Sequence, residues 1–102
     1  MIPQALSRSE VGLIAGVLRR HPEISTVKLF GSRAKGTHTA RSDVDLALWG
    51  VDALGAEAVA GELDDLPLPY HFDVISFHLI NQESLREHIE RVGVPLSGLP
   101  SV

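Results

Sequence analysis

Residues 29–48, LFGSRAKGTHTARSDVDLAL, constrain the fold of this chain more than any other stretch. The apolar and β-branched runs 25–30 and 44–49 each stop at a glycine, which predicts two strands. If these strands are antiparallel neighbours, Gly31 at the end of the first lies beside Asp43 and Asp45 at the start of the second. Side chains alternate along a strand, so both aspartates point to one face of the sheet. Two like charges on one face need a compensating partner, which the residues leave open between a metal ion, an arginine and water.

The N-terminal residues carry signals for a helix. Ser7 and Glu10 have the spacing of a capping box at the start of an apolar periodic segment, and Pro22 follows the end of that segment. Gly12 and Gly16 lie inside the predicted helix, where each costs about 1 kcal/mol relative to alanine. Close packing against another element would explain these two glycines.

The second half of the chain predicts two further helices and a strand. Asp52 is the expected N-cap of a helix that runs to about residue 66. Residues 70–79, YHFDVISFHL, are rich in aromatic and β-branched residues and predict a third strand. Asn81 is the expected N-cap of a last helix, which ends with Gly93 at its C′ position.

Length and composition agree with one α/β domain spanning residues 1–102. We expect the order α-β-α-β-α-β-α, with a short second helix at residues 32–35, and a mixed, mainly three-stranded sheet packed on helices. The tail adds a short edge segment at most. The chain has no cysteine, no signal-peptide segment and no apolar run near the ~20 residues that span a bilayer, so we expect a cytoplasmic protein without a membrane partner.

The charges are distributed unevenly along the chain. Residues 1–42 carry seven Lys/Arg against two acidic residues, whereas residues 43–102 carry two against eleven. An acidic second half argues against binding to a nucleic-acid backbone, which relies on clustered cations. The acidic residues of the predicted helix after Asp52 form a solvated helix face or, if a basic protein partner exists, a docking face for it.

The residues around the aspartate pair suggest phosphate chemistry. Gly31 can let a phosphate approach the backbone, and a short helix beginning near Ser32 would aim free N–H groups at an anion. Divalent cations held by carboxylates bridge phosphate oxygens and lower the pKa of an attacking hydroxyl. Asp73, an unpaired aspartate in the third predicted strand, is the candidate for a third carboxylate. Arg33 and Lys35 follow the turn and are read either as contacts to a triphosphate or acceptor, or as solvated helix surface.

The sequence "GSRAKG", ten residues between Ser32 and Asp43, and "SDVDLAL" together resemble the G-S-x10-D-x-D signature of the DNA polymerase beta-like nucleotidyltransferase superfamily. In length and element order, residues 7–96 look like the MNT-type minimal nucleotidyltransferases. The resemblance implies that Asp43, Asp45 and Asp73 are catalytic and ligate one or two Mg²⁺ ions. It also implies that Gly31 and Ser32 bind the nucleotide, with Arg33 and Lys35 as further candidates.

The same resemblance implies a donor and a partner. The donor would be ATP or another nucleoside triphosphate. The acceptor would be a tyrosine of a HEPN-domain ribonuclease toxin, which the chain would silence as an antitoxin by adenylylation. Two alternatives stay open: an antitoxin that acts by complex formation without turnover, and a nucleotidyltransferase that modifies a small molecule. The oligomeric state stays open between a homodimer and a hetero-oligomer.

Overall fold

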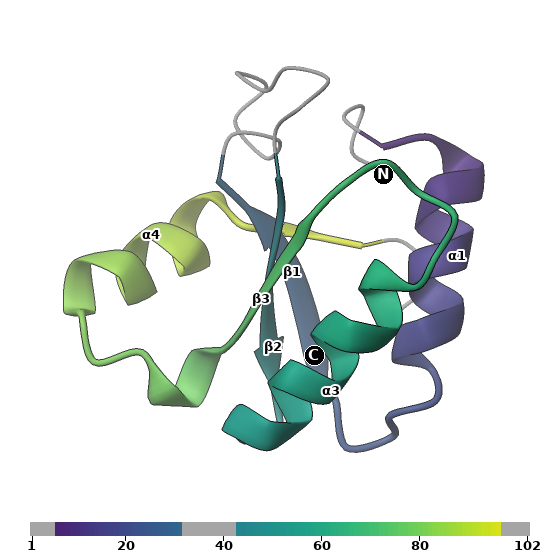
Figure 1. The fold of residues 1–102 in the computed structure, drawn as a ribbon. Helices are drawn as coiled ribbons and strands as arrows, with labels where there is room; N and C mark the ends of the chain where they lie inside the picture. Colours follow the sequence, from purple (N-terminus) through teal and green to yellow (C-terminus); the bar gives the residue numbers. More distant parts are fainter. Residues whose placement is uncertain (1–5, 32–42, 97–102) are drawn as a thin grey trace.

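The computed structural model of the chain describes residues 6–31 and 43–96 (Figure 1). The predicted short helix at residues 32–35 lies outside these ranges. None of the helices in the described part has the length and apolar character that crossing a bilayer demands. The elements follow one another as α1 (Arg8–Leu18), β1 (Thr26–Phe30), β2 (Val44–Trp49), α3 (Ala53–Asp64), β3 (Phe72–Ser76), the 3-10 helix η1 (Phe77–Leu79), α4 (Glu83–Val92) and β4 (Val94–Pro95).

The four strands form one mixed sheet in the order β3-β2-β1-β4. β1 and β2 are antiparallel neighbours, which is the condition for the expected approach of Gly31 to the aspartates, and Phe30 lies opposite Asp45. β2 and β3 are parallel. Between them, α3 returns the chain to the end of the sheet at which β2 begins. The predicted α/β class with a mixed, mainly three-stranded sheet is confirmed. The expected edge segment is the two-residue β4, which pairs with β1.

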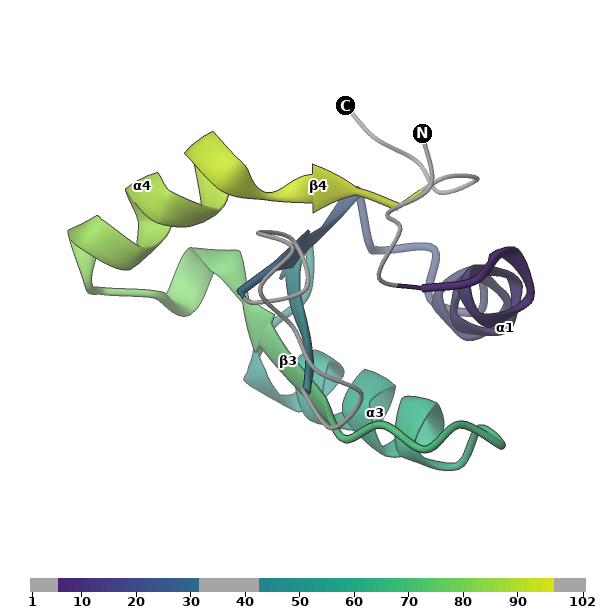
Figure 2. The ribbon, with the colours of Figure 1, turned by 90° about the horizontal axis from the view of Figure 1, so that it is seen from above.

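Helices cover the two faces of this sheet unequally (Figures 1 and 2). α1 and α3 lie on one face, and α4 lies on the other. Val44 and Leu46 point into the larger core, shared with α1 and α3, and are fully buried there. Ala47 points the opposite way into a smaller core with Phe77 and Ile89. The smaller core does not include the first residues of β2 and β3. On this face of the sheet, the end where β2 and β3 begin is therefore not covered by the smaller core.

Two predicted helix starts are confirmed by their caps. The hydroxyl of Ser7 accepts the backbone N–H of Glu10 at 3.1 Å, and the Glu10 carboxylate accepts the N–H of Ser7 at 2.8 Å. These two bonds complete the capping box of α1. At the start of α3, the Asp52 carboxylate accepts the N–H of Gly55 at 2.8 Å.

The proposed packing role of the two glycines in α1 is wrong. Gly12 and Gly16 are exposed, and a Cβ added at either position would meet no atom within 4 Å. Nothing in the described part of the molecule approaches the helix at these positions closely enough to require glycine. Their cost in helix propensity is therefore not offset by packing.

Gly12→Ala and Gly16→Ala are each expected to raise the free energy of unfolding by about 1 kcal/mol, because alanine loses less backbone entropy in a helix. Urea denaturation of each variant measures the change. Gly55→Ala is the control, since its Cβ would lie 3.1 Å from the Cβ of Val51 and should give a smaller gain. An unchanged midpoint for both α1 variants would contradict the expectation.

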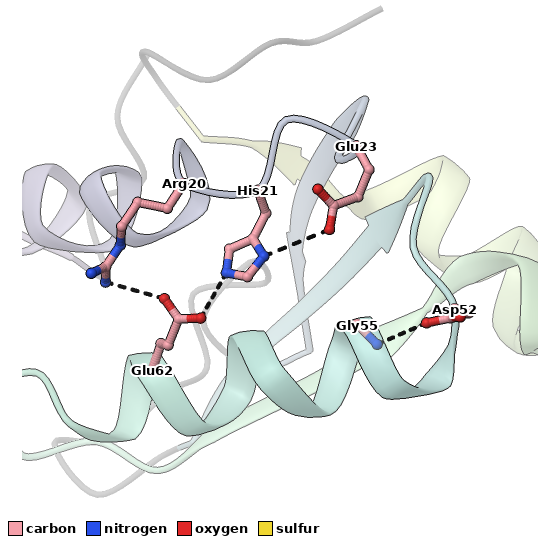
Figure 3. A network of polar contacts seen from close by, with 6 residues as sticks. All are labelled: Arg20, His21, Glu23, Asp52, Gly55 and Glu62. Atoms are coloured by element: carbon pink, nitrogen blue, oxygen red, sulfur yellow. Dashed lines mark hydrogen bonds and ion pairs between the residues drawn. The ribbon is translucent and has the colours of Figure 1, made fainter.

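Polar contacts tie the end of α1 to α3 (Figure 3). The ring of His21, whose side chain is 16% exposed, places Nε2 2.8 Å from Oε2 of Glu62. Its Nδ1 lies 3.6 Å from Oε2 of Glu23, and Nη2 of Arg20 lies 3.2 Å from Oε1 of Glu62. The Glu62 carboxylate of α3 therefore contacts two residues that follow α1, Arg20 and His21.

Glu62→Ala is expected to lower the free energy of unfolding by about 1–2 kcal/mol, since it leaves the mostly buried side chain of His21 without its nearest hydrogen-bond partner. Glu87→Ala is the matched control: the Glu87–Arg91 pair is solvent-exposed on both sides, and such pairs contribute less than about 0.5 kcal/mol. Chemical denaturation of both variants compares them. Equal losses would show that the contacts of His21 add no stability.

The third strand is shorter than the predicted 70–79. β3 ends at Ser76, whose hydroxyl donates to the carbonyl of Val51 at 2.6 Å. The next residue, Phe77, is buried against Trp49 with their ring centroids 4.2 Å apart. Because Phe77 turns into the smaller core, the chain leaves the sheet and forms η1 instead of extending the strand.

The predicted N-cap of the last helix is wrong by one residue. α4 has Gln82 at its N-cap, not Asn81, and no side chain caps it. The helix starts later than predicted because η1 extends the preceding turn: the N–H of Ile80 donates to the carbonyl of Phe77 at 3.2 Å. The carbonyl of Ile80 in turn accepts the guanidinium of Arg86 at 3.1 Å.

The predicted C′ position of Gly93 is also wrong by one residue, because Gly93 is the C-cap of α4. Gly93 follows α4 with φ −63° and ψ 141°, an extended conformation that leads directly into β4. Glycine is needed there for space: an added Cβ would overlap the carbonyl oxygen of Ile89 and lie 3.0 Å from Cδ of Lys28.

Candidate active site

The three candidate carboxylates lie at one end of the sheet. Asp45 is the second residue of β2, and Asp73 is the second residue of β3. The parallel register places them directly opposite each other. Since paired residues of neighbouring strands point to the same face, both side chains lie on the face opposite the buried Val44 and Leu46. Asp43 precedes β2 by one residue and is exposed on the same side of the chain as Asp45.

Gly31 meets Asp45 at the end of β1. Phe30, the last residue of β1, pairs with Asp45, and Gly31 follows with φ +77°. A Cβ at Gly31 would overlap the carboxylate of Asp45. The predicted juxtaposition of Gly31 with the aspartates is therefore observed. Ser32, Arg33 and Lys35 lie outside the described residues.

The electrostatics of the cluster centre on Asp45. Burial raises the pKa of the Asp45 carboxyl above its ordinary value of 3.8, and the negative charges of Asp73 and then Asp43 raise it further. Within residues 6–31 and 43–96, no cationic side chain forms an ion pair with any of these three carboxylates. The cluster therefore concentrates negative charge that this part of the chain does not neutralise.

The donor atoms of this cluster are of the type that binds a divalent cation, but the three side chains are too far apart to hold one together. Carboxylate oxygens on neighbouring strands are the ligand type that Mg²⁺ prefers. In the described part of the chain, however, no group of three or more His, Cys, Asp or Glu side chains is gathered closely enough to hold a metal ion. Mutual repulsion of like charges on Asp43, Asp45 and Asp73 favours separated side chains.

Phe30 is a site neighbour that the sequence reading did not single out. It stands opposite Asp45 and shares its face of the sheet. Its half-buried ring packs against the smaller core, so it forms the apolar boundary between that core and the carboxylates. The sequence signal was available, because period two places residue 30 on the same face of β1 as Lys28 and opposite the buried Leu29.

A family model described as "Polymerase beta, Nucleotidyltransferase" matches residues 13–98. No protein of curated function matches the chain in sequence.

Several solved structures are similar in fold. A toxin-antitoxin with AMP-PNP superposes with TM-score 0.72 at 25% identity, over 87% of this chain and 73% of that one. A protein described as a minimal nucleotidyltransferase gives TM-score 0.62 at 25% identity, over 94% and 97%. A complex of the tri-AMPylated Shewanella oneidensis HEPN toxin with MNT antitoxin gives TM-score 0.69 at 20% identity, over 92% and 74%.

Proposed function

Because the chain belongs to the Polymerase beta nucleotidyltransferase family, we propose that it transfers AMP from ATP to a hydroxyl group of a partner protein. The observation that carries this proposal is the register of β2 and β3, which sets Asp45 opposite Asp73. Asp43 lies two residues before Asp45 in the sequence, and Gly31 lies against the carboxylate of Asp45. Carboxylates from two strands beside a glycine turn suit a triphosphate and its cation.

Asp43, Asp45 and Asp73 would hold Mg²⁺, which when bound would supply charge neutralisation at the triphosphate and favour the ionised acceptor hydroxyl. The raised pKa of Asp45 fits this role, because the cluster lacks a counter-charge from the described residues. The lack of a side chain at Gly31 lets the Asp45 carboxylate lie directly against the backbone at the end of β1, next to the segment that would bind the triphosphate. Ser32, Arg33 and Lys35 follow Gly31 in the sequence and would contact the triphosphate.

The acceptor hydroxyl would attack the α-phosphorus in line with the leaving pyrophosphate. The new bond joins the acceptor oxygen to the α-phosphorus, and the bond from that phosphorus to the bridging oxygen of the β-phosphate breaks. Of the two paired residues, Asp73 is exposed, whereas Asp45 is half-buried. The open side of the site at Asp73 is therefore where the acceptor would enter.

The acceptor is proposed to be a tyrosine of a HEPN-domain toxin, which makes this chain a cytoplasmic antitoxin. Two of the similar structures support this: one is a toxin-antitoxin with AMP-PNP, and another contains a tri-AMPylated HEPN toxin with MNT antitoxin. Together they contain a nucleotide analogue and an AMPylated HEPN toxin bound to an MNT antitoxin.

The experiment is to incubate the chain with a HEPN toxin encoded beside it, ATP and Mg²⁺, and to record the intact mass of the toxin. The expected result is a toxin carrying one or more AMP groups, formed with Mg²⁺ and suppressed by EDTA. Tryptic mapping should locate the adduct on tyrosine. Neutralisation of the toxin in a stable complex without any adduct would overturn the proposal and establish an antitoxin that acts by binding.

A further inference from the structure

A hollow of about 430 Å³ lies along the free edge of β3. β3 is the outermost strand, and no strand in the described part of the chain pairs with its outer side. Val74 and Ile75 both line the hollow although neighbouring strand residues point to opposite faces. The hollow must therefore straddle the strand edge, with backbone at its floor. Its walls come from α3 on one side and from η1 and the start of α4 on the other. We call this hollow the β3 groove.

The β3 groove is apolar and open. Leu79, on the wall formed by η1, is 57% exposed, and Val74 and Ile75 are only half-buried. Edge strands usually carry charges or prolines that prevent another strand from pairing with them. Val74 and Ile75 provide neither protection at the centre of this edge. An apolar edge of this kind suits an added strand, held by backbone hydrogen bonds and by pockets for alternate side chains.

Charge decides which strand can be added. Glu57 is the charged residue that lines the β3 groove, and the exposed Asp73 borders its end. A second copy of this chain docked by the same edge would bring the same two carboxylates to it, and like charges disfavour that pairing. A segment that alternates apolar residues with Lys or Arg would fill the groove and neutralise its rim.

We propose that the β3 groove binds an extended, basic and apolar segment of the protein acceptor as an additional strand on β3. Val74, the first strand residue in the groove, directly follows Asp73 of the candidate active site. A segment held there is continuous with the site, so the groove would position the acceptor whose hydroxyl reacts. The inference rests on the proposed function only in identifying the docked protein with the acceptor.

Binding is tested with the full chain and a fluorescein-labelled peptide of alternating Val and Lys, against its Val-Glu counterpart. The Val-Lys peptide is expected to bind and the Val-Glu peptide is not. Leu79→Glu should weaken binding by about tenfold or more, because it places a charge in the apolar wall. Leu13→Glu is the matched control, since Leu13 on α1 is another exposed leucine, at 39%.

This pair of variants separates docking from simple charge attraction. Both add one negative charge, so attraction alone would leave binding of the basic peptide unchanged or stronger in both. Hydrogen exchange should show protection of the β3 amides when the peptide binds. Absence of binding, protection elsewhere than β3, or equal effects of Leu79→Glu and Leu13→Glu would overturn the proposal. Self-association of the chain that Leu79→Glu abolishes would also overturn it, in favour of a second copy.

A transfer assay then keeps this inference apart from the proposed function. With the HEPN toxin as acceptor, Leu79→Glu should raise KM about tenfold or more, while transfer to free N-acetyltyrosinamide stays at the wild-type rate. Equal toxin kinetics in the wild type and Leu79→Glu would overturn the docking role. If the wild type itself transfers nothing to either acceptor, the proposed function fails, and the peptide and hydrogen-exchange results still decide whether the groove binds a strand.

Discussion

Asp45→Asn is expected to reduce AMP transfer by about a thousandfold while leaving the protein folded. Asp45 is the central carboxylate: it stands opposite Asp73 and abuts Gly31. Its amide replacement would remove one negative ligand and several kcal/mol of charge stabilisation, and each ~1.4 kcal/mol is a factor of ten in rate. The initial rate of adduct formation, followed by intact mass, measures the loss. Asp65→Asn, at an exposed aspartate after α3, is the control and should keep the wild-type rate.

The same substitution should make the metal-free fold more stable at neutral pH. The pKa of Asp45 is raised in the folded state, so the folded protein holds this proton more tightly than the unfolded chain. The carboxyl therefore disfavours folding increasingly as pH rises from 3.8, its ordinary pKa, through its folded pKa. In EDTA, the Tm of Asp45→Asn should exceed that of the wild type at pH 7, and the difference should vanish near pH 3.

Mg²⁺ should reverse this order. A cation that binds the folded cluster stabilises the wild type by mass action, and it should stabilise Asp45→Asn less. Thermal unfolding with and without Mg²⁺ at pH 7 measures both shifts. Full transfer activity in Asp45→Asn would contradict the assigned site, and a Tm below that of the wild type in EDTA would contradict the destabilising charge.

Local sequence rules were sufficient where an element is defined by its own residues. β2 begins and ends where predicted, because Val44, Leu46 and Leu48 alternate with residues of the other face and Gly50 stops the run. The start of α1 followed from Ser7 and Glu10 for the same reason. In each case the signal lies within the element itself or directly beside it: the alternation of side chains and a glycine stop for β2, and the capping box for α1.

Features that depend on contacts distant in the sequence were not predictable from local rules. The direct pairing of Asp45 with Asp73 depends on the length of α3 and on how it packs, although the sequence offered Asp73 in the third predicted strand as a candidate third carboxylate. The end of β3 depends on the stacking of Phe77 on Trp49, about thirty residues earlier in the chain. The β3 groove depends on three elements at once, so no single stretch of sequence indicates it.

Two glycines with positive φ in the described part of the chain, Gly31 and Gly50, are expected to separate activity from stability. Gly31, with φ +77°, and Gly50, with φ +98°, both strain an alanine, but an added Cβ meets different groups. At Gly31 it meets the carboxylate of Asp45, the end of a side chain that can rotate away. At Gly50 it meets the backbone carbonyl oxygen of Glu23, which cannot move without shifting the chain. Displacement of a reactive group by about 1 Å can cost about a hundredfold in rate.

Gly31→Ala should therefore reduce AMP transfer by about a hundredfold with a stability loss of only about 1–2 kcal/mol. Gly50→Ala should lose about 2–4 kcal/mol, yet its folded fraction should transfer AMP at the wild-type rate, because residue 50 lies at the far end of β2 from Asp45, about 17 Å along the strand. Urea denaturation and transfer rates, measured on both variants at a temperature where both are folded, test the pair. If Gly31→Ala retained its rate, the close approach of the backbone to Asp45 would have no role in catalysis; if Gly50→Ala lost its rate while folded, the site would extend to the opposite end of the sheet.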